Sequence, residues 1–224
     1  LPDSALILAA YARWGTDCPR YLIGDFAFAI WDSSARRLFA ARDTEGVCTF
    51  FYHVTPQRFA FASEIKALLA LPDVPRRPNR ATLAAYLGVQ LPGPAERAAT
   101  FYEAIFRLPP AHWMCLEDGR MQMAQYWTAQ DVPDVRFSAE NDYIEAYRAL
   151  FEEAVRCRLR RTGPVGAHLS GGLDSSSVVC MARHLLPPDS PLRTYYALSD
   201  DPARDERKYV QAVTALFGPN RPLV

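Results

Sequence analysis

The side chains with the clearest chemical potential lie together between an apolar run and a helical pattern: Ser170, Gly171, Gly172, Asp174 and Ser175. We expect a short buried strand over 164–170 and a helix over 175–186. A helix that starts at the carboxyl end of a parallel strand presents N–H groups without internal partners, and its dipole favours an anion. Glycines let the backbone approach that anion and can take a positive φ, while serines add hydroxyl donors. The spacing therefore predicts a phosphate-binding loop.

Asp174 is the unusual member of this loop, because a carboxylate repels phosphate groups. Two interpretations stay open: it shares a Mg²⁺ ion with the phosphates, or it caps the helix that follows. The loop lacks the Gly-Lys-Ser/Thr of a Walker A sequence and the G-x-G-x-x-G of a dinucleotide site. A glycine turn with a serine-rich helix cap is the alternative that involves no ligand.

The second half of the chain alternates helical and strand patterns, with expected helices over 141–160, 175–186 and 205–218 and expected strands over 164–170 and 192–199. This alternation predicts a parallel α/β sheet. The first half differs, since it shows a helix over 3–15, alternating strand patterns around 26–30, 38–42, 49–54 and 58–63, and a hairpin turn at Asp118-Gly119. We therefore predict two domains, 1–127 and 141–224, joined by a polar linker over 128–140.

Bulk composition narrows the class of protein. The 224 residues carry 25 Lys plus Arg and 25 Asp plus Glu, so no net charge recruits nucleic acid or a membrane surface. Five scattered cysteines favour a reducing compartment over a disulfide framework, and no apolar run reaches membrane-spanning length. We expect a cytoplasmic protein. A start at Leu1 within a helical pattern suggests a piece of a longer chain.

The segment "LSGGLDSS" resembles the pyrophosphatase loop, S-G-G-x-D-S, of ATP-dependent ligases that release AMP and pyrophosphate. Four further segments, "GDFAFAIWD", "ARDTEG", "FASEIKALL" and "RLPPAHW", precede it in that order. Together they resemble the glutamine-hydrolysing asparagine synthetase family over essentially the whole chain. The resemblance implies a partial α+β layered domain of the N-terminal-nucleophile glutaminase type, followed by a partial parallel α/β domain like the adenine nucleotide α-hydrolases.

What the family does implies the chemistry expected here. Ammonia released from glutamine would attack a carboxylate, most simply aspartate, that ATP has activated with Mg²⁺, giving asparagine, AMP, pyrophosphate and glutamate. The substrates would be small molecules, with neither nucleic acid nor membrane involved, and the family permits a homodimer. The residues that match the nucleotide-binding stretch are Leu169, Ser170, Gly171, Gly172, Leu173, Asp174 and Ser175, with Asp174 as the expected Mg²⁺ ligand.

The glutaminase half carries fewer matching residues. Asp3 matches the aspartate that grips the α-amino group of glutamine, and a helix N-cap is the alternative role for it. The nucleophile, an N-terminal cysteine, would precede Leu1, and none of the five cysteines can replace it because its own α-amino group serves as the base. Arg42 and Asp43 are expected to form a structural ion pair. The four histidines show no metal-ligand spacing.

Two other functions stay open. Residues 48–52 read Cys-Thr-Phe-Phe-Tyr where the family usually has Arg-Pro-Leu-Tyr-Tyr. This departure fits a relative with a degenerate glutaminase site, such as a lasso-peptide cyclase, which joins a side-chain carboxylate to an α-amine. The other alternative is a nucleotide-binding regulatory module without catalysis, although such a module has no need of a pyrophosphate site.

Overall fold

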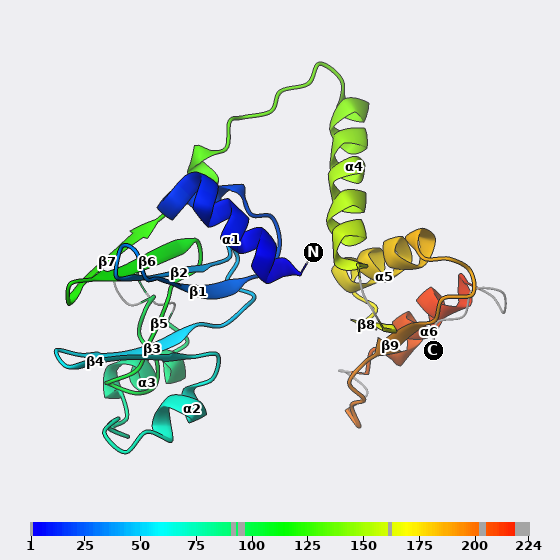
Figure 1. Cartoon of the computed structure of the whole chain (residues 1–224). Helices are drawn as coiled ribbons and strands as arrows, with labels where there is room; N and C mark the ends of the chain where they lie inside the picture. Colours follow the sequence, from blue (N-terminus) through cyan, green and yellow to red (C-terminus); the bar gives the residue numbers. More distant parts are fainter. Residues whose placement is uncertain (1, 91–92, 94–96, 161–162, 202–204, 218–224) are drawn as a thin grey trace. The chain divides into compact units, whose positions relative to one another are not determined.

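The computed structural model describes residues 2–90, 93, 97–160, 163–201 and 205–217. The chain divides into two compact units, Leu1–Asp134 and Val135–Val224 (Figure 1). The division falls within the predicted linker. Each unit is described by itself below.

Unit 1 contains two antiparallel sheets and several short helices. The helical elements are α1 (Asp3–Trp14), η1 (Gly15–Tyr21), α2 (Ile65–Leu69), α3 (Arg80–Leu87) and η3 (Ala129–Asp131). The strands are β1 (Ala27–Asp32), β2 (Arg37–Arg42), β3 (Phe51–Thr55), β4 (Arg58–Ala62), β5 (Phe106–Arg107), β6 (His112–Glu117) and β7 (Arg120–Gln125). One sheet has the order β1-β2-β6-β7 and the other the order β4-β3-β5. The sequence predicted one β layer, whereas the strands divide between two sheets.

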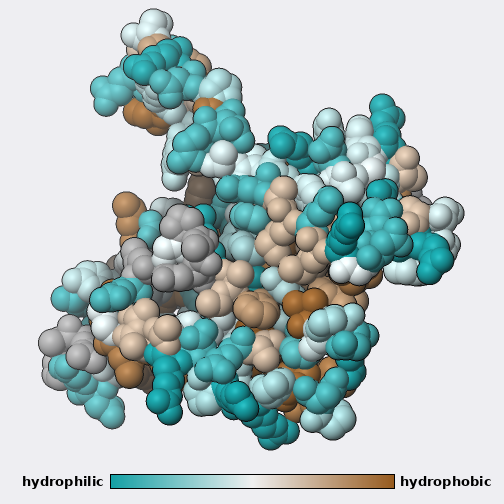
Figure 2. Space-filling view, turned by 90° about the vertical axis from the view of Figure 1, so that its left-hand side faces the viewer, coloured by the Kyte–Doolittle hydropathy of each residue, from teal (hydrophilic) through white to brown (hydrophobic). Residues whose placement is uncertain are grey.

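The alternation of side chains along β2 explains how this unit builds its core. Phe39 belongs to a buried cluster that includes Ala10 of α1, whereas its neighbour Ala40 belongs to a cluster with Phe50 and Met114. Successive residues of a strand point to opposite faces, so β2 is covered on both sides. Figure 2 shows that hydrophobic residues on the visible outer face lie scattered among hydrophilic ones, as is ordinary for a protein surface.

Unit 2 is a helix followed by a strand–helix–strand–helix series: α4 (Glu140–Arg158), β8 (Val165–His168), α5 (Leu173–Leu185), β9 (Leu192–Tyr195) and α6 (Arg207–Ala215). β8 and β9 pair in parallel, with Val165 opposite Leu192 and His168 opposite Tyr195. Their shared core contains Leu169, Val179 and Val210. The predicted parallel pairing of these strands is confirmed, although β9 ends four residues earlier than the expected strand over 192–199.

Several local predictions are confirmed and one boundary matters for the site. The helix expected over 141–160 is α4, and the turn at Asp118-Gly119 joins β6 to β7 with positive φ at both residues. The helix expected from residue 175 begins at Leu173 instead. Among the described residues, every helix is too short or too polar to cross a membrane.

Candidate functional site

The loop between β8 and α5 is held by a small network of its own serines. Leu169 is fully buried and its N–H donates to the Tyr195 carbonyl at 2.9 Å, which extends the parallel pairing by one residue. The Ser170 N–H donates to Ser175 Oγ at 3.1 Å, and the two serine Oγ atoms lie 3.0 Å apart. Ser175 Oγ in turn donates to the Gly172 carbonyl at 3.3 Å. These bonds fix the loop around the start of α5.

The two glycines of the loop have different roles. Gly171 has φ +79°, and a Cβ built there would lie 2.3 Å from Tyr209 Cβ and 3.1 Å from the Val210 nitrogen. Gly172 has φ −69° and ψ 164°, which any residue can adopt, and its nearest such neighbour is Ser170 Oγ at 3.5 Å. Positive φ is therefore confirmed at Gly171 and absent at Gly172. Gly171 packs against α6, whereas a Cβ at Gly172 would make only an ordinary contact with Ser170 Oγ.

The first backbone N–H groups of α5 have no acceptor within the helix. Gly172 is its N-cap residue and supplies no side-chain hydrogen bond. The first N–H groups of a helix have no acceptor within the helix, so an anion placed here would find several aligned donors and the positive end of the dipole. Leu173, at 84% exposed, leaves the start of the helix uncovered. The geometry fits a phosphate group.

Asp174 lies in the first turn of α5, one residue inside the helix, and is exposed. The interpretation of Asp174 as the helix cap is wrong, because Gly172 occupies the cap position. The described residues contain no cluster of three or more His, Cys, Asp or Glu side chains that could hold a metal ion. A Mg²⁺ ion at Asp174 would thus need oxygen ligands from a phosphate, the way protein sites commonly bind Mg²⁺.

Asp3 lies in the first turn of α1 and is exposed. The N-cap of α1 is Pro2, and no side chain caps the helix. The helix-cap role for Asp3 is therefore wrong, and its proposed contact with glutamine stays a prediction.

Arg42 and Asp43 anchor the loop between β2 and β3 through backbone groups. Arg42 donates to the carbonyls of Cys48 at 2.6 Å, Leu108 at 2.8 Å and Gly46. The Asp43 carboxylate accepts the N–H groups of Val47 at 2.9 Å, Cys48 at 3.0 Å and Phe26 at 3.3 Å. The expected ion pair is replaced by these backbone contacts, although the expected structural role is confirmed.

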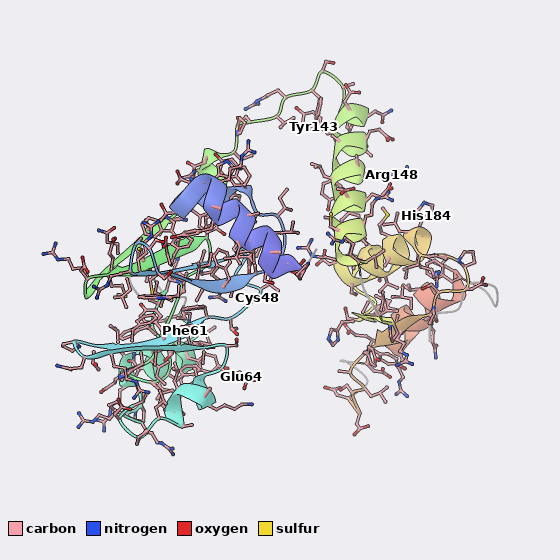
Figure 3. The ribbon with its side chains drawn as sticks, viewed as in Figure 1. Cys48, Phe61, Glu64, Tyr143, Arg148 and His184 are labelled. Atoms are coloured by element: carbon pink, nitrogen blue, oxygen red, sulfur yellow. The ribbon has the colours of Figure 1, made fainter. Side chains whose placement is uncertain are left out.

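None of the cysteines carries the signature of a nucleophile. Figure 3 shows Cys48 in the segment between β2 and β3, where burial, Asp43 and Asp25 raise the pKa of its thiol. Burial and Asp17 raise the pKa of the Cys18 thiol to about 11. The pKa values of the other three thiols are raised as well, by burial at Cys115 and Cys180 and by a hydrogen bond to Glu153 at Cys157. A reactive thiolate needs the opposite shift.

Tyr209 is the residue of this site that the sequence did not indicate. Its contact with Gly171 joins positions far apart along the chain, and no local pattern marks it. Arg183 was also missed: it is fully buried in α5 and donates to the carbonyls of Ser190 at 2.6 Å, Leu186 at 3.2 Å and Pro187. These bonds hold the turn that leads from α5 to β9.

Comparison with known proteins agrees with the two units. The family described as glutamine amidotransferase domain matches residues 2–127, and the family described as asparagine synthase matches residues 146–221. The first unit is thus a glutamine amidotransferase domain. With both matches in this order, the chain belongs to the glutamine-hydrolysing asparagine synthetase family.

Individual relatives support the same family. Asparagine synthetase [glutamine-hydrolyzing] 3 of Bacillus subtilis is 36% identical over 96% of this chain and 36% of the relative. Putative asparagine synthetase [glutamine-hydrolyzing] 2 of Methanocaldococcus jannaschii is 31% identical over 96% of this chain and 41% of the relative. Amidase chry2 of Gibberella zeae is 33% identical over 85% of this chain and 28% of the relative. The chain spans between 28% and 41% of the length of these relatives.

Proposed function

We propose that this chain is part of an ATP-dependent amide-forming ligase that makes asparagine from aspartate, with glutamine as the nitrogen donor and AMP, pyrophosphate and glutamate as the other products. Unit 1 would be a layered α+β domain of the N-terminal-nucleophile glutaminase type. Unit 2 would be the start of a parallel, nucleotide-binding α/β domain, and residues 128–140 would form the linker. The observation that carries the proposal is the open start of α5, where Gly172 leaves the helix N–H groups uncapped.

The residues of the loop divide the work of binding. The N–H groups of Gly172, Leu173 and Asp174 would bind phosphate oxygens, because none of them has an acceptor inside α5. Ser170 and Ser175 would orient the loop and offer their hydroxyls. Leu169 anchors the loop in the core, and Gly171 lets it pass close to α6. Asp174 would hold Mg²⁺ together with the phosphates.

ATP, when bound, supplies a leaving pyrophosphate: a carboxylate oxygen of the substrate attacks the α-phosphorus, and ammonia then displaces AMP from the carbonyl carbon. The chain's own part is to hold the leaving pyrophosphate in place and to neutralise its charge with fixed donors. On the glutaminase side, Asp3 would bind the α-amino group of glutamine.

ATP–pyrophosphate exchange in the full-length protein that contains this chain tests the proposal. We expect aspartate-dependent exchange, reduced about 100-fold or more in Asp174→Asn, as for the loss of a group that stabilises transition-state charge. Asp189→Asn is the matched control, because Asp189 is also exposed but lies beyond the end of α5. Unchanged exchange in Asp174→Asn would remove Asp174 from the site.

An isopeptide cyclase is the second candidate, and the segment from Cys48 to Tyr52 favours it because it departs from the family pattern. The same full-length protein distinguishes the candidates when ammonium chloride replaces glutamine. Asparagine formation supports the synthetase. Exchange that needs a peptide carboxylate rather than aspartate supports the cyclase, and nucleotide binding without any exchange supports a regulatory module.

A further inference from the structure

Unit 1 contains a cavity of about 300 Å³ that none of the functions above uses. It lies between α3 and the chain that leads through Arg97 and Phe101 to Arg107 of β5. Its volume is at the lower end of the range for ligand pockets, about 300–1,000 Å³. A small molecule would fill it.

The polar lining of this cavity is cationic. Arg97 and Arg107 both line it, together with the amides Asn79 and Gln90, and no Asp or Glu is among its described lining residues. Neither arginine forms an ion pair with any of the described residues. The Nε atom of Arg107 is buried and has no hydrogen-bond partner among the described residues. A buried donor without an acceptor destabilises the fold, and more so when the group is charged.

Arg107 lies close enough to the partly buried Arg42 for their like charges to interact. Burial lowers the pKa of the Arg42 guanidinium, Asp43 opposes that effect, and the positive charge of Arg107 lowers the pKa further. Arg42 donates its hydrogen bonds to three backbone carbonyls. It is itself a cation, so it cannot balance the charge of Arg107. An anion beside Arg107 would oppose this repulsion.

The backbone keeps Arg107 at the cavity. Its N–H donates to the Ala98 carbonyl at 2.8 Å, and the next residue, Leu108, donates to the Phe50 carbonyl at 2.9 Å. Arg107 also stands opposite Phe51 in the pairing of β5 with β3. A backbone held from two sides in this way fixes where the Arg107 side chain starts before a ligand arrives, which lowers the entropic cost of binding.

The rest of the described lining combines apolar and aromatic side chains with uncharged polar ones. Tyr86 and Phe101 meet edge to face, with ring centroids 5.4 Å apart and planes at 78°. Asn79 Oδ1 accepts the Thr82 N–H at 3.2 Å as the cap of α3, so its amide NH₂ is the group that remains to donate. Carboxylates pair with guanidinium groups through two parallel hydrogen bonds. The lining of this cavity therefore fits an anion that also has an apolar part.

We infer that this cavity binds a small organic carboxylate, with the carboxylate between Arg107 and Arg97 and an apolar body against Tyr86 and Phe101.

Phenylacetate is a suitable probe, and residues 1–224 are the protein to use. By calorimetry we expect saturable binding of phenylacetate, no binding of its neutral counterpart phenylacetamide, and at most weak binding of inorganic phosphate. Arg107→Met and Arg97→Gln should each weaken phenylacetate binding at least tenfold. Arg80→Gln is the matched control, because Arg80 is exposed at the start of α3, the helix beside the cavity, and is not among the residues that line it.

A second readout separates a binding role from a structural one. Arg107→Met keeps the length of the side chain but removes the unpaired charge, so without ligand the Tm of unit 1 should stay equal or rise. Equal binding of phenylacetamide, tighter binding of phosphate than of phenylacetate, or a fall in Tm for Arg107→Met would overturn the inference. Unchanged binding of phenylacetate in Arg97→Gln would overturn it as well.

Discussion

Two loops of this protein use a glycine with positive φ in opposite ways. The loop from Arg42 to Cys48 has Gly46 at φ +69°, and the loop from Leu169 to Ser175 has Gly171 at φ +79°. In the first, the buried Arg42 and Asp43 side chains bind backbone groups of the loop itself. In the second, the start of α5 remains uncapped. The first loop satisfies its own polar groups, and the second leaves donors for a partner.

The contrast between these two loops separates residues that stabilise the fold from residues that are available to bind a ligand. A buried charged group must find its partners within the fold, since leaving it unpaired is costly. Polar groups at a surface can hydrogen-bond to water instead, and they remain available to a ligand. Mutations in the Arg42–Cys48 loop should therefore act on folding, and mutations at the open side of the Leu169–Ser175 loop should act on binding.

The largest expected effect is that of Asp43→Ala. It removes the acceptor of three backbone N–H groups in a buried site, so we expect unit 1 to lose about 3 kcal/mol or more of unfolding free energy. Urea unfolding followed by tryptophan fluorescence measures it, because all four tryptophans lie in unit 1: Trp14, Trp31, Trp113 and Trp127. Asp17→Asn, which alters an exposed pair with Arg20, should change little. An unchanged midpoint in Asp43→Ala would contradict the comparison.

The next effect separates the two neighbouring glycines. Gly171→Ala brings a Cβ against Tyr209 and strains a positive φ, so we expect about 1–3 kcal/mol of destabilisation in unit 2. Gly172→Ala should change stability by less than about 0.5 kcal/mol, yet weaken nucleotide binding in the full-length protein. Hydrogen exchange of the α5 and α6 amides measures the first effect and calorimetry the second. Equal protection in both variants would show that the contact with α6 is unimportant.

A smaller effect distinguishes two adjacent serines. Ser175→Ala breaks the serine network at the loop and should cost about 0.5–1 kcal/mol. Ser176 Oγ is buried and finds no hydrogen-bond partner in the part of the chain that the structure describes, so Ser176→Ala should leave stability equal or slightly higher. Thermal unfolding of the two variants beside the parent chain provides the measurement. Destabilisation by Ser176→Ala that matches Ser175→Ala would show that the network is not what holds the loop.

The smallest effect is the pH dependence of one carboxylate in each unit. The Ala35 N–H holds the pKa of Asp32 below its ordinary value, and the Arg207 N–H does the same for Asp205. A lowered carboxyl pKa stabilises the fold above the unfolded pKa, about 3.9, and this contribution is lost as the pH falls through the folded pKa. Carboxyl NMR titration should place both pKa values below 3.9. A value at or above 3.9 for either would refute its assigned hydrogen bond.

The sequence predicted the elements better than the contacts between them. Local periodicity and turn residues sufficed for the hairpin at Asp118-Gly119, for α4 and for the glycine loop itself. The serine run predicts a helix from residue 175, whereas α5 begins two residues earlier, at Leu173. A structural role for Asp43 was expected from the sequence, whereas its three backbone partners became known only from the structure. The division of the strands into two sheets, and the packing of Tyr209 on Gly171, depend on tertiary contacts that no local pattern encodes.

The contact between Gly171 and α6 also sets a time order for synthesis of the chain. Tyr209 and Val210 are made about 40 residues after Gly171, which at about 5–20 residues per second is a delay of roughly 2–8 seconds. Val210 also completes the buried cluster around Leu169. Until α6 has left the ribosome, the loop therefore lacks the surface that fixes its shape. A nascent chain stalled before residue 207 would present the whole "LSGGLDSS" sequence without the contact that α6 provides.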